Sequence, residues 1–185
     1  MKHNNVGNKF FSEEIVFENH WRQLTEKQID KYIDNFPGKN DFVEFYLSHN
    51  GGSFTEGAGL FADDHIKVPD DYKEIEVENF LHIPLSDDGD AKPYTYSIAK
   101  EKERRYGYSE KFDSFILSHI PFADNAGDNT FWLDKITGEV KYIDYENMGY
   151  DSDCAIIAAS SFIDFCKRIK SLSSVFNSDS IRNKN

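Results

Sequence analysis

The sequence has few cysteines and no long apolar run, and each shortage argues against a class of protein. Cys154 and Cys166 are the only cysteines among 185 residues, and they form no CxxC pair. They suggest free, mostly buried thiols in a reducing compartment rather than a disulfide framework. The longest wholly apolar run covers residues 154–159, far too short to cross a membrane. No apolar stretch of signal-peptide length follows residues 1–5, so we expect a soluble cytoplasmic protein.

Basic residues are also scarce. The chain carries 21 Lys and Arg against 33 Asp and Glu, a formal net charge of −12. This balance disfavours binding to a phosphate backbone or to an anionic membrane surface. An acidic surface instead attracts cationic partners, including basic proteins. The alternative is that the charge only keeps a cytosolic protein in solution.

Motifs for catalysis or cofactor binding are missing. Residues 57–62 (GAGLFA) have the letters of a dinucleotide fingerprint, but Asp63 and Asp64 follow where a diphosphate would sit. A Gly-rich loop is therefore the favoured interpretation. The six histidines form no HExxH motif or zinc spacing, and His49 lies on an apolar stripe that favours a satisfied core or boundary histidine over a metal ligand. Ser118 precedes His119 without any GxSxG elbow.

Charged clusters also have ordinary explanations. The acidic runs 87–90 and 124–128 have the composition of cation ligands but not the order of an EF-hand loop, and turns prefer the same residue types. The run 100–105 (KEKERR) is basic but diluted by two glutamates, so we interpret it as a solvated helix face rather than a nucleic-acid patch. We expect no metal site and no cofactor.

Hydrophobic periodicity predicts the fold class. Apolar stripes with suitable caps predict helices over residues 25–36, 41–49 and 161–170. Residues 97–106 are charged and helix-prone, with Glu101 and Arg105 spaced for an i,i+4 pair, and predict a surface helix or an inserted loop. Alternation and β-branched or aromatic content predict strands over residues 74–83, 115–120, 129–134 and 139–145, with a short hairpin loop at 135–138. Helices, then strands, then a helix, without βαβ alternation, predict an α+β fold with a mainly antiparallel sheet.

Four segments resemble, in order, the signatures of the SMI1/KNR4 (SUKH) superfamily. Residues 41–52 (DFVEFYLSHNGG) resemble its "FLL-x-x-NGG" helix end, and residues 120–134 (IPFADNAGDNTFWLD) resemble its Ile-Pro strand, acidic Gly turn and Leu-Asp strand. Residues 137–144 (TGEVKYID) match "G-x-V-x-x-x-D", and residues 158–165 (AASSFIDF) are similar to "A-x-SF-x-x-F". The acidic turn has Ala126-Gly127 where the family often has two glycines, and residues 91–111 resemble an insertion.

The resemblance implies N-terminal helices packed on a mainly antiparallel sheet with a C-terminal helix. It divides the chain into a partly ordered segment 1–20, a single domain 21–170 and a flexible Ser/Asn-rich tail 171–185. It also assigns a structural role to the residues of the four motifs: Asn50, Gly51, Gly52, Pro121, Asp124, Gly127, Asp128, Trp132, Leu133, Asp134, Gly138, Phe162 and Phe165.

The function that the resemblance implies is that of a bacterial immunity protein, an antitoxin that is not an enzyme. Such a protein binds a cognate polymorphic toxin, here expected to be a basic nuclease domain, and occludes its active site. Two alternatives stay open: a regulatory scaffold of the same fold, and an enzyme or ligand-binding domain whose site is assembled from dispersed residues. We expect no nucleic-acid or membrane partner and a monomer or weak homodimer. The expected partner-binding residues lie in acidic loops: Asp87, Asp88 and Asp90 in one, and Asp63, Asp64, Asp70 and Asp71 in another.

Overall fold

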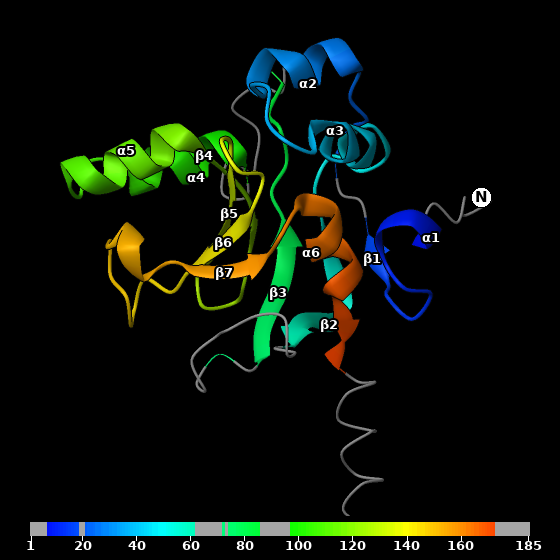
Figure 1. Cartoon of the computed structure of the whole chain (residues 1–185). Coiled ribbons are helices and arrows are strands. Elements are labelled where there is room, and N and C mark those ends of the chain that lie inside the picture. Colours follow the sequence, from blue (N-terminus) through cyan, green and yellow to red (C-terminus); the bar gives the residue numbers. More distant parts are fainter. Residues whose placement is uncertain (1–6, 19–20, 62–71, 73, 86–96, 173–185) are drawn as a thin grey trace, which may run out of the picture.

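The computed structural model describes residues 7–18, 21–61, 72, 74–85 and 97–172 (Figure 1). Within these residues, one eight-stranded antiparallel sheet has the order β1-β2-β3-β4-β5-β6-β7, and β8 pairs with β2. The strands are β1 (Phe17–Glu18), β2 (Gly52–Phe61), β3 (Glu74–Phe80), β4 (His119–Asp124), β5 (Thr130–Asp134), β6 (Val140–Ile143), β7 (Ile156–Ala159) and β8 (Lys170–Ser171). The helices are α1 (Gly7–Phe10), α2 (Glu26–Tyr32), α3 (Lys39–Ser48), α4 (Ile98–Arg105), α5 (Glu110–Ser118), α6 (Phe162–Arg168) and the 3₁₀ turn η3 (Ser152–Cys154). The predicted α+β class with a mainly antiparallel sheet is confirmed.

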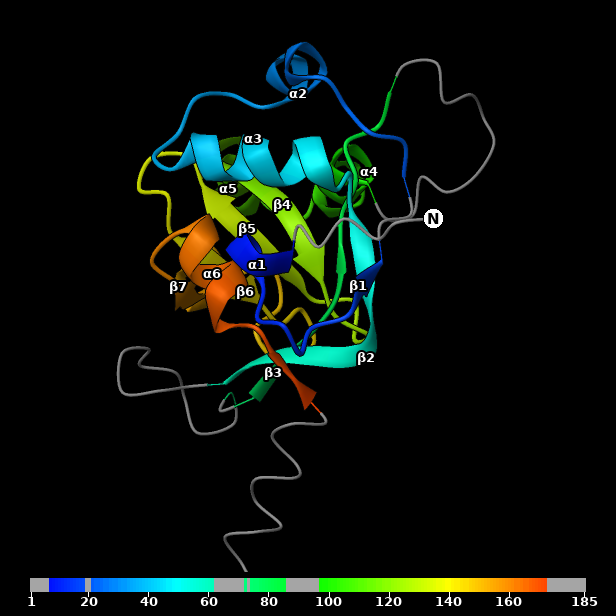
Figure 2. The ribbon, with the colours of Figure 1, turned by 90° about the vertical axis from the view of Figure 1, so that its right-hand side faces the viewer.

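Helices cover both faces of the central strands. Figure 2 shows α1, α3 and α6 in front of the sheet and α4 and α5 behind it. Strand β5 is buried along its whole length for this reason. Because successive side chains point to opposite faces, Phe131 and Leu133 join the large core, whereas Trp132 joins a second core under α5. The second core contains Phe112, Phe115, Ile116, Trp132 and Ile143.

Both N-terminal helices form near their predicted positions, but of the two predicted caps only Thr25 is confirmed. Thr25 begins α2, and its backbone N–H donates to Gln28 Oε1 at 2.9 Å, as a capping box requires. Helix α3 begins at Lys39 rather than after Asp41, because Gly38 takes a left-handed conformation (φ 84°) at the N-cap. Its buried face carries Phe42, Phe45 and Tyr46, which pack on the sheet together with Phe162 of α6 and Phe80.

Three predictions of local structure are wrong. Residues 57–61 of the predicted Gly-rich loop 57–62 are instead part of β2, a ten-residue strand paired with β3 and β8, and residue 62 lies outside the described residues. Residues 115–118 are the last turn of α5 rather than a strand, because Phe112, Phe115 and Ile116 are spaced to cover the second core. Cys154 is exposed, although Cys166 is buried as expected.

The first and the last strand of the described residues, β1 and β8, both pair with β2. Phe10 and Phe11 are buried, and β1 pairs with β2 through Phe17 and Phe54. Strand β8 pairs with the other end of β2. Residues 173–185 of the predicted tail lie outside the described residues.

Candidate functional site

The acidic residues predicted to bind a partner all fall in segments 62–71 and 86–96. Asp63, Asp64, Asp70, Asp71, Asp87, Asp88 and Asp90 therefore lie outside the described residues. Their role stays a prediction.

The Asn50-Gly51-Gly52 motif joins three elements. The Asn50 side chain accepts a hydrogen bond from the Ile83 backbone N–H at 2.8 Å and donates to the Ile83 and Arg22 carbonyls, both at 3.2 Å. A Cβ at Gly52 would lie 2.2 Å from the Glu18 carbonyl oxygen, and the φ of 152° is also one that L residues rarely adopt. The motif is buried and connects the end of α3 to the segment after β3 and to the edge strand β1.

The acidic turn between β4 and β5 is built from its own polar side chains. Asp124 is buried and accepts from Asn79 Nδ2 at 2.9 Å. Desolvation raises the pKa of Asp124 to about 7. Asn125 Oδ1 accepts from the Asn129 backbone N–H at 3.0 Å. The left-handed residue of the turn is Asp128 (φ 64°), not the neighbouring Gly127, a conformation that aspartate tolerates better than most residues.

The other motif residues lie in the sheet and the core. Pro121 and Leu133 occupy buried strand positions, and Gly138 turns the β5–β6 hairpin against Pro37. Phe162 and Phe165 of α6 pack on Phe122.

Helix α4 carries an ionic network whose burial and whose contact with Asp128 the sequence did not indicate. The side chains of Glu101 and Arg105 are 1% and 7% exposed, and Arg105 Nε donates to Glu101 Oε1 at 3.0 Å. Arg104 also pairs with Glu101, and both arginines reach the Asp128 carboxylate, at 2.5 Å and 3.0 Å. Despite desolvation, the Glu101 carboxylate raises the pKa of Arg105. The interpretation of residues 100–105 as a solvated face is therefore wrong for the Glu101/Arg105 stripe, because this stripe faces the acidic turn.

Ser118, His119 and Asp134, which are the residue types of a catalytic triad, lie close together. Ser118 Oγ lies 2.9 Å from His119 Nδ1, and His119 Nε2 lies 3.5 Å from Asp134 Oδ2. Nδ1 is also 2.8 Å from the Phe115 carbonyl oxygen. Since a carbonyl only accepts, Nδ1 carries the proton and cannot take one from Ser118. Nε2 is then left to accept from Lys141 Nζ at 3.1 Å.

The protonation states in this cluster fit a structural role. Desolvation lowers the pKa of His119 to about 4. Desolvation opposes ionisation of Asp134 as well, but hydrogen bonds from Lys141 and from the Ile136 and Thr137 amides lower its pKa to about 2. A neutral histidine whose Nδ1 carries the proton cannot act as a base toward the Ser118 hydroxyl beside it. The arrangement ties α5 to the β5–β6 hairpin.

His49 is half-buried, as a boundary histidine would be, but within the described residues its ring is not fully hydrogen-bonded, contrary to the prediction. Its ring packs on Phe17 and Phe45, and burial lowers its pKa. Nδ1 has no hydrogen-bond partner within the described part of the chain. Nor do the described residues contain a group of His, Cys, Asp or Glu side chains that could hold a metal ion.

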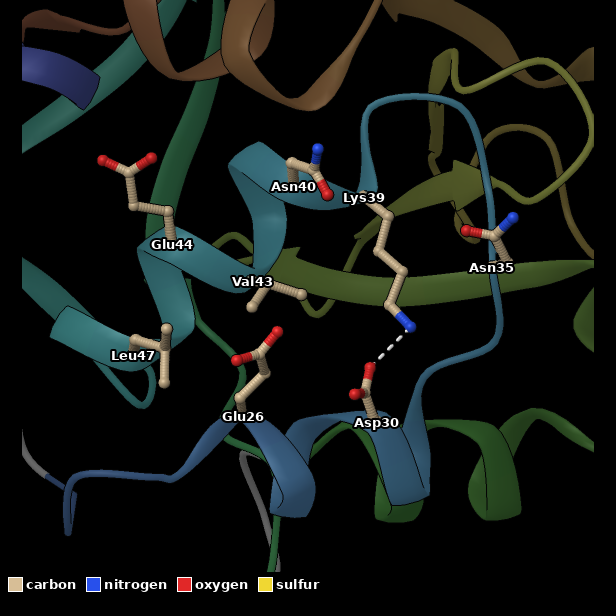
Figure 3. A pocket seen from close by; sticks show the side chains of 8 residues that line it. All are labelled: Glu26, Asp30, Asn35, Lys39, Asn40, Val43, Glu44 and Leu47. Carbon is tan, nitrogen blue, oxygen red and sulfur yellow. Dashed lines mark hydrogen bonds and ion pairs between the residues drawn. The ribbon is translucent and has the colours of Figure 1, made fainter.

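An open groove lies between α2 and α3 (Figure 3). It has a volume of about 430 Å³ and is lined by Glu26, Asp30, Asn35, Lys39, Asn40, Val43, Glu44 and Leu47. Lys39 Nζ pairs with Asp30 at 2.7 Å, and Glu44 pairs with Lys9. Carboxylates around an aliphatic floor suit the binding of a basic side chain. The lining combines no nucleophile with a base.

These features define an α+β domain in which the residues of the four sequence motifs form turns, buried strands and parts of the core. The chain belongs to the SMI1 / KNR4 family (SUKH-1), whose sequence model matches residues 23–168. Residues 91–111 therefore lie within the matched region. Comparison with curated proteins and with solved structures gave no match. In the described residues, no helix is both long and apolar enough to cross a membrane.

Proposed function

We propose that this chain is an immunity protein that binds and neutralises a cognate toxin. Membership of the SMI1 / KNR4 family over residues 23–168 carries the proposal, because the resemblance implies that role for bacterial members. The site geometry is consistent with it. The one Ser–His–Asp contact described has the wrong tautomer for catalysis, so binding is a better-supported activity than chemistry.

The charge of the chain supports a cationic toxin domain, with a nuclease as the favoured class. A nuclease must attract phosphate and so presents a basic field. A protein of net charge −12 complements that field and accelerates encounter. Inhibition would follow by steric occlusion of the toxin's active site.

Co-expression with a toxin tests the proposal. The C-terminal domain of a toxin-like protein encoded beside this gene is expressed alone and together with this chain, and cell growth is recorded. We expect growth to be rescued, and size-exclusion chromatography with light scattering to give a 1:1 complex. Expression of the toxin domain with an empty vector is the negative control.

Salt dependence tests the electrostatic part separately. Association measured between about 50 and 300 mM salt should slow as salt rises, because exposed charges are screened over this range. Rescue with salt-independent association would remove the charge argument but keep the immunity function. A folded chain that neither rescues growth nor binds the toxin domain would favour a regulatory scaffold of the same fold.

A further inference from the structure

Two stacked tyrosines lie where the α4–α5 link meets the segment after β6. The rings of Tyr108 and Tyr150 have centroids 3.5 Å apart and an interplanar angle of 9°. Tyr108 is 56% exposed. Figure 1 shows the segment between β6 and β7 directly below α5, at the end of the molecule away from α1 and α6. We call Tyr108, Tyr150, Asp151 and Asp153 the tyrosine surface.

Buried side chains of α4 and of the second core fix the position of Tyr150 in the tyrosine surface. Arg105 Nη1 donates to Tyr150 Oη at 3.3 Å, and the Arg105 guanidinium lies 3.7 Å from the centre of the Tyr145 ring. Trp132 Nε1 in turn donates to Tyr145 Oη at 3.1 Å. The rings of Phe112 and Tyr150 pack in a T-shaped arrangement with centroids 5.3 Å apart. Tyr150 is thus anchored to the second core before any partner arrives, which lowers the entropy lost on binding.

The rim of the surface is acidic. Residues 145–153 contain Glu146, Asp151 and Asp153 and no basic residue. Lys111 Nζ pairs with Asp151 at 2.8 Å and with Asp153 at 2.5 Å. Both aspartates stay at least half exposed, so they can accept hydrogen bonds from an incoming cation.

Aromatic faces beside carboxylates recognise guanidinium and ammonium groups. The ring attracts the cation through its quadrupole, and the carboxylates add charge-assisted hydrogen bonds. Tyrosine is also among the residues that contribute most to protein interfaces, because it buries a large area at a small entropy cost. Tyr108 belongs to neither core cluster of the described residues and contacts the fold through its stack on Tyr150.

We propose that the tyrosine surface is where the basic toxin domain docks, with arginine or lysine side chains of the toxin over Tyr108 and between Asp151 and Asp153. This inference rests on the proposed function and specifies its interface. The groove between α2 and α3 fits less well, because none of the described residues that line it is aromatic.

Matched variants of the two surfaces test the assignment. The probe is the purified toxin domain encoded beside this gene, and calorimetry at 150 mM salt gives its Kd. We expect Tyr108→Ser and the double variant Asp151→Lys/Asp153→Lys each to raise Kd at least about tenfold, as loss of an interface hot spot does. Tyr108→Phe, which keeps the ring, should stay within about threefold of the native chain. Tyr32→Ser, at a tyrosine of α2 that is 40% exposed, is the matched control and should leave Kd unchanged.

Thermal melts separate contact from folding. Tyr108→Ser should melt within about 2 °C of the native chain, as surface substitutions do. If the native chain binds, but Glu44→Lys abolishes binding while Tyr108→Ser does not, the partner docks in the groove and this inference is overturned alone. If the native chain neither binds the toxin domain nor rescues growth, the proposed function fails and the inference fails with it.

Discussion

Replacement of Arg105 by alanine should destabilise the protein strongly, although Arg105 lies on a helix whose composition is that of a solvated one. The change removes four hydrogen bonds, to Glu101, Tyr150 and the backbone and side chain of Asp128, and the stacking on Tyr145. It leaves Glu101, whose side chain is 1% exposed, with only Arg104 and Thr130 as described polar side-chain partners. Breaking a buried ion pair from one side costs about 3–5 kcal/mol. For a chain of this length, that loss lowers Tm by roughly 10 °C.

Guanidinium unfolding followed by tryptophan fluorescence measures the loss, since Trp132 lies in the second core beside this network. Arg105→Lys should recover only part of it, because an ammonium group cannot make the forked contacts. The double variant Glu101→Gln/Arg105→Met should lose less than Arg105→Ala, because no charge is left without its main partner. A loss below about 1 kcal/mol for Arg105→Ala would refute the reasoning and return α4 to the class of solvated helices.

Three further predictions concern the motif residues. Trp132→Ala should lose about 3–5 kcal/mol because Trp132 is fully buried, and circular-dichroism melts measure this. Gly138→Ala should destabilise more than Gly107→Ala in the same melts: both have a positive φ, but only at Gly138 would the Cβ meet a carbonyl oxygen, that of Pro37 at 2.7 Å. The Asp124 pKa is raised from 3.8 to about 7 by folding, so its contribution to stability is full below about pH 4 and is lost as pH rises through 7. Asp124→Asn should therefore become more stable than the native chain between pH 5 and pH 8, by as much as about 4 kcal/mol, and urea unfolding that showed no widening gap would contradict the burial of this carboxyl group.

The fold class and most element positions could be predicted from local signals. The capping box at Thr25, the apolar stripe of α3 and the Gly138 hairpin each depend on residues close in sequence. Strand β2 could not be found this way, because its glycines resemble a loop and its pairing with β3 and β8 is set by distant chain segments. Residues 115–118 form helix although the sequence predicts a strand there. Phe115, Ile116 and Leu117 are a short apolar run, and periodicity alone does not distinguish a strand from a buried helix in such a run.

The burial of charged side chains could not be predicted from the sequence either. The spacing of Glu101 and Arg105 indicated an i,i+4 pair, which the structure contains, but spacing does not reveal what faces the pair. The partner is Asp128, more than twenty residues further on. The same limit applies to Tyr108 and Tyr150, because their stacking depends on how the α4–α5 link meets the segment after β6.

Arg105 connects the two parts of the molecule that these predictions concern. On one side it contacts Asp128 in the acidic turn between β4 and β5, and on the other it contacts Tyr150 in the tyrosine surface. Tyr108 sits outside that network, on the exposed face of Tyr150. Substitutions at Tyr108 should therefore change affinity for a partner at almost constant stability, whereas substitutions at Arg105 should change both. Under the proposed docking, Tyr108 supplies the contact with the partner, and the buried Arg105 keeps the supporting surface in place.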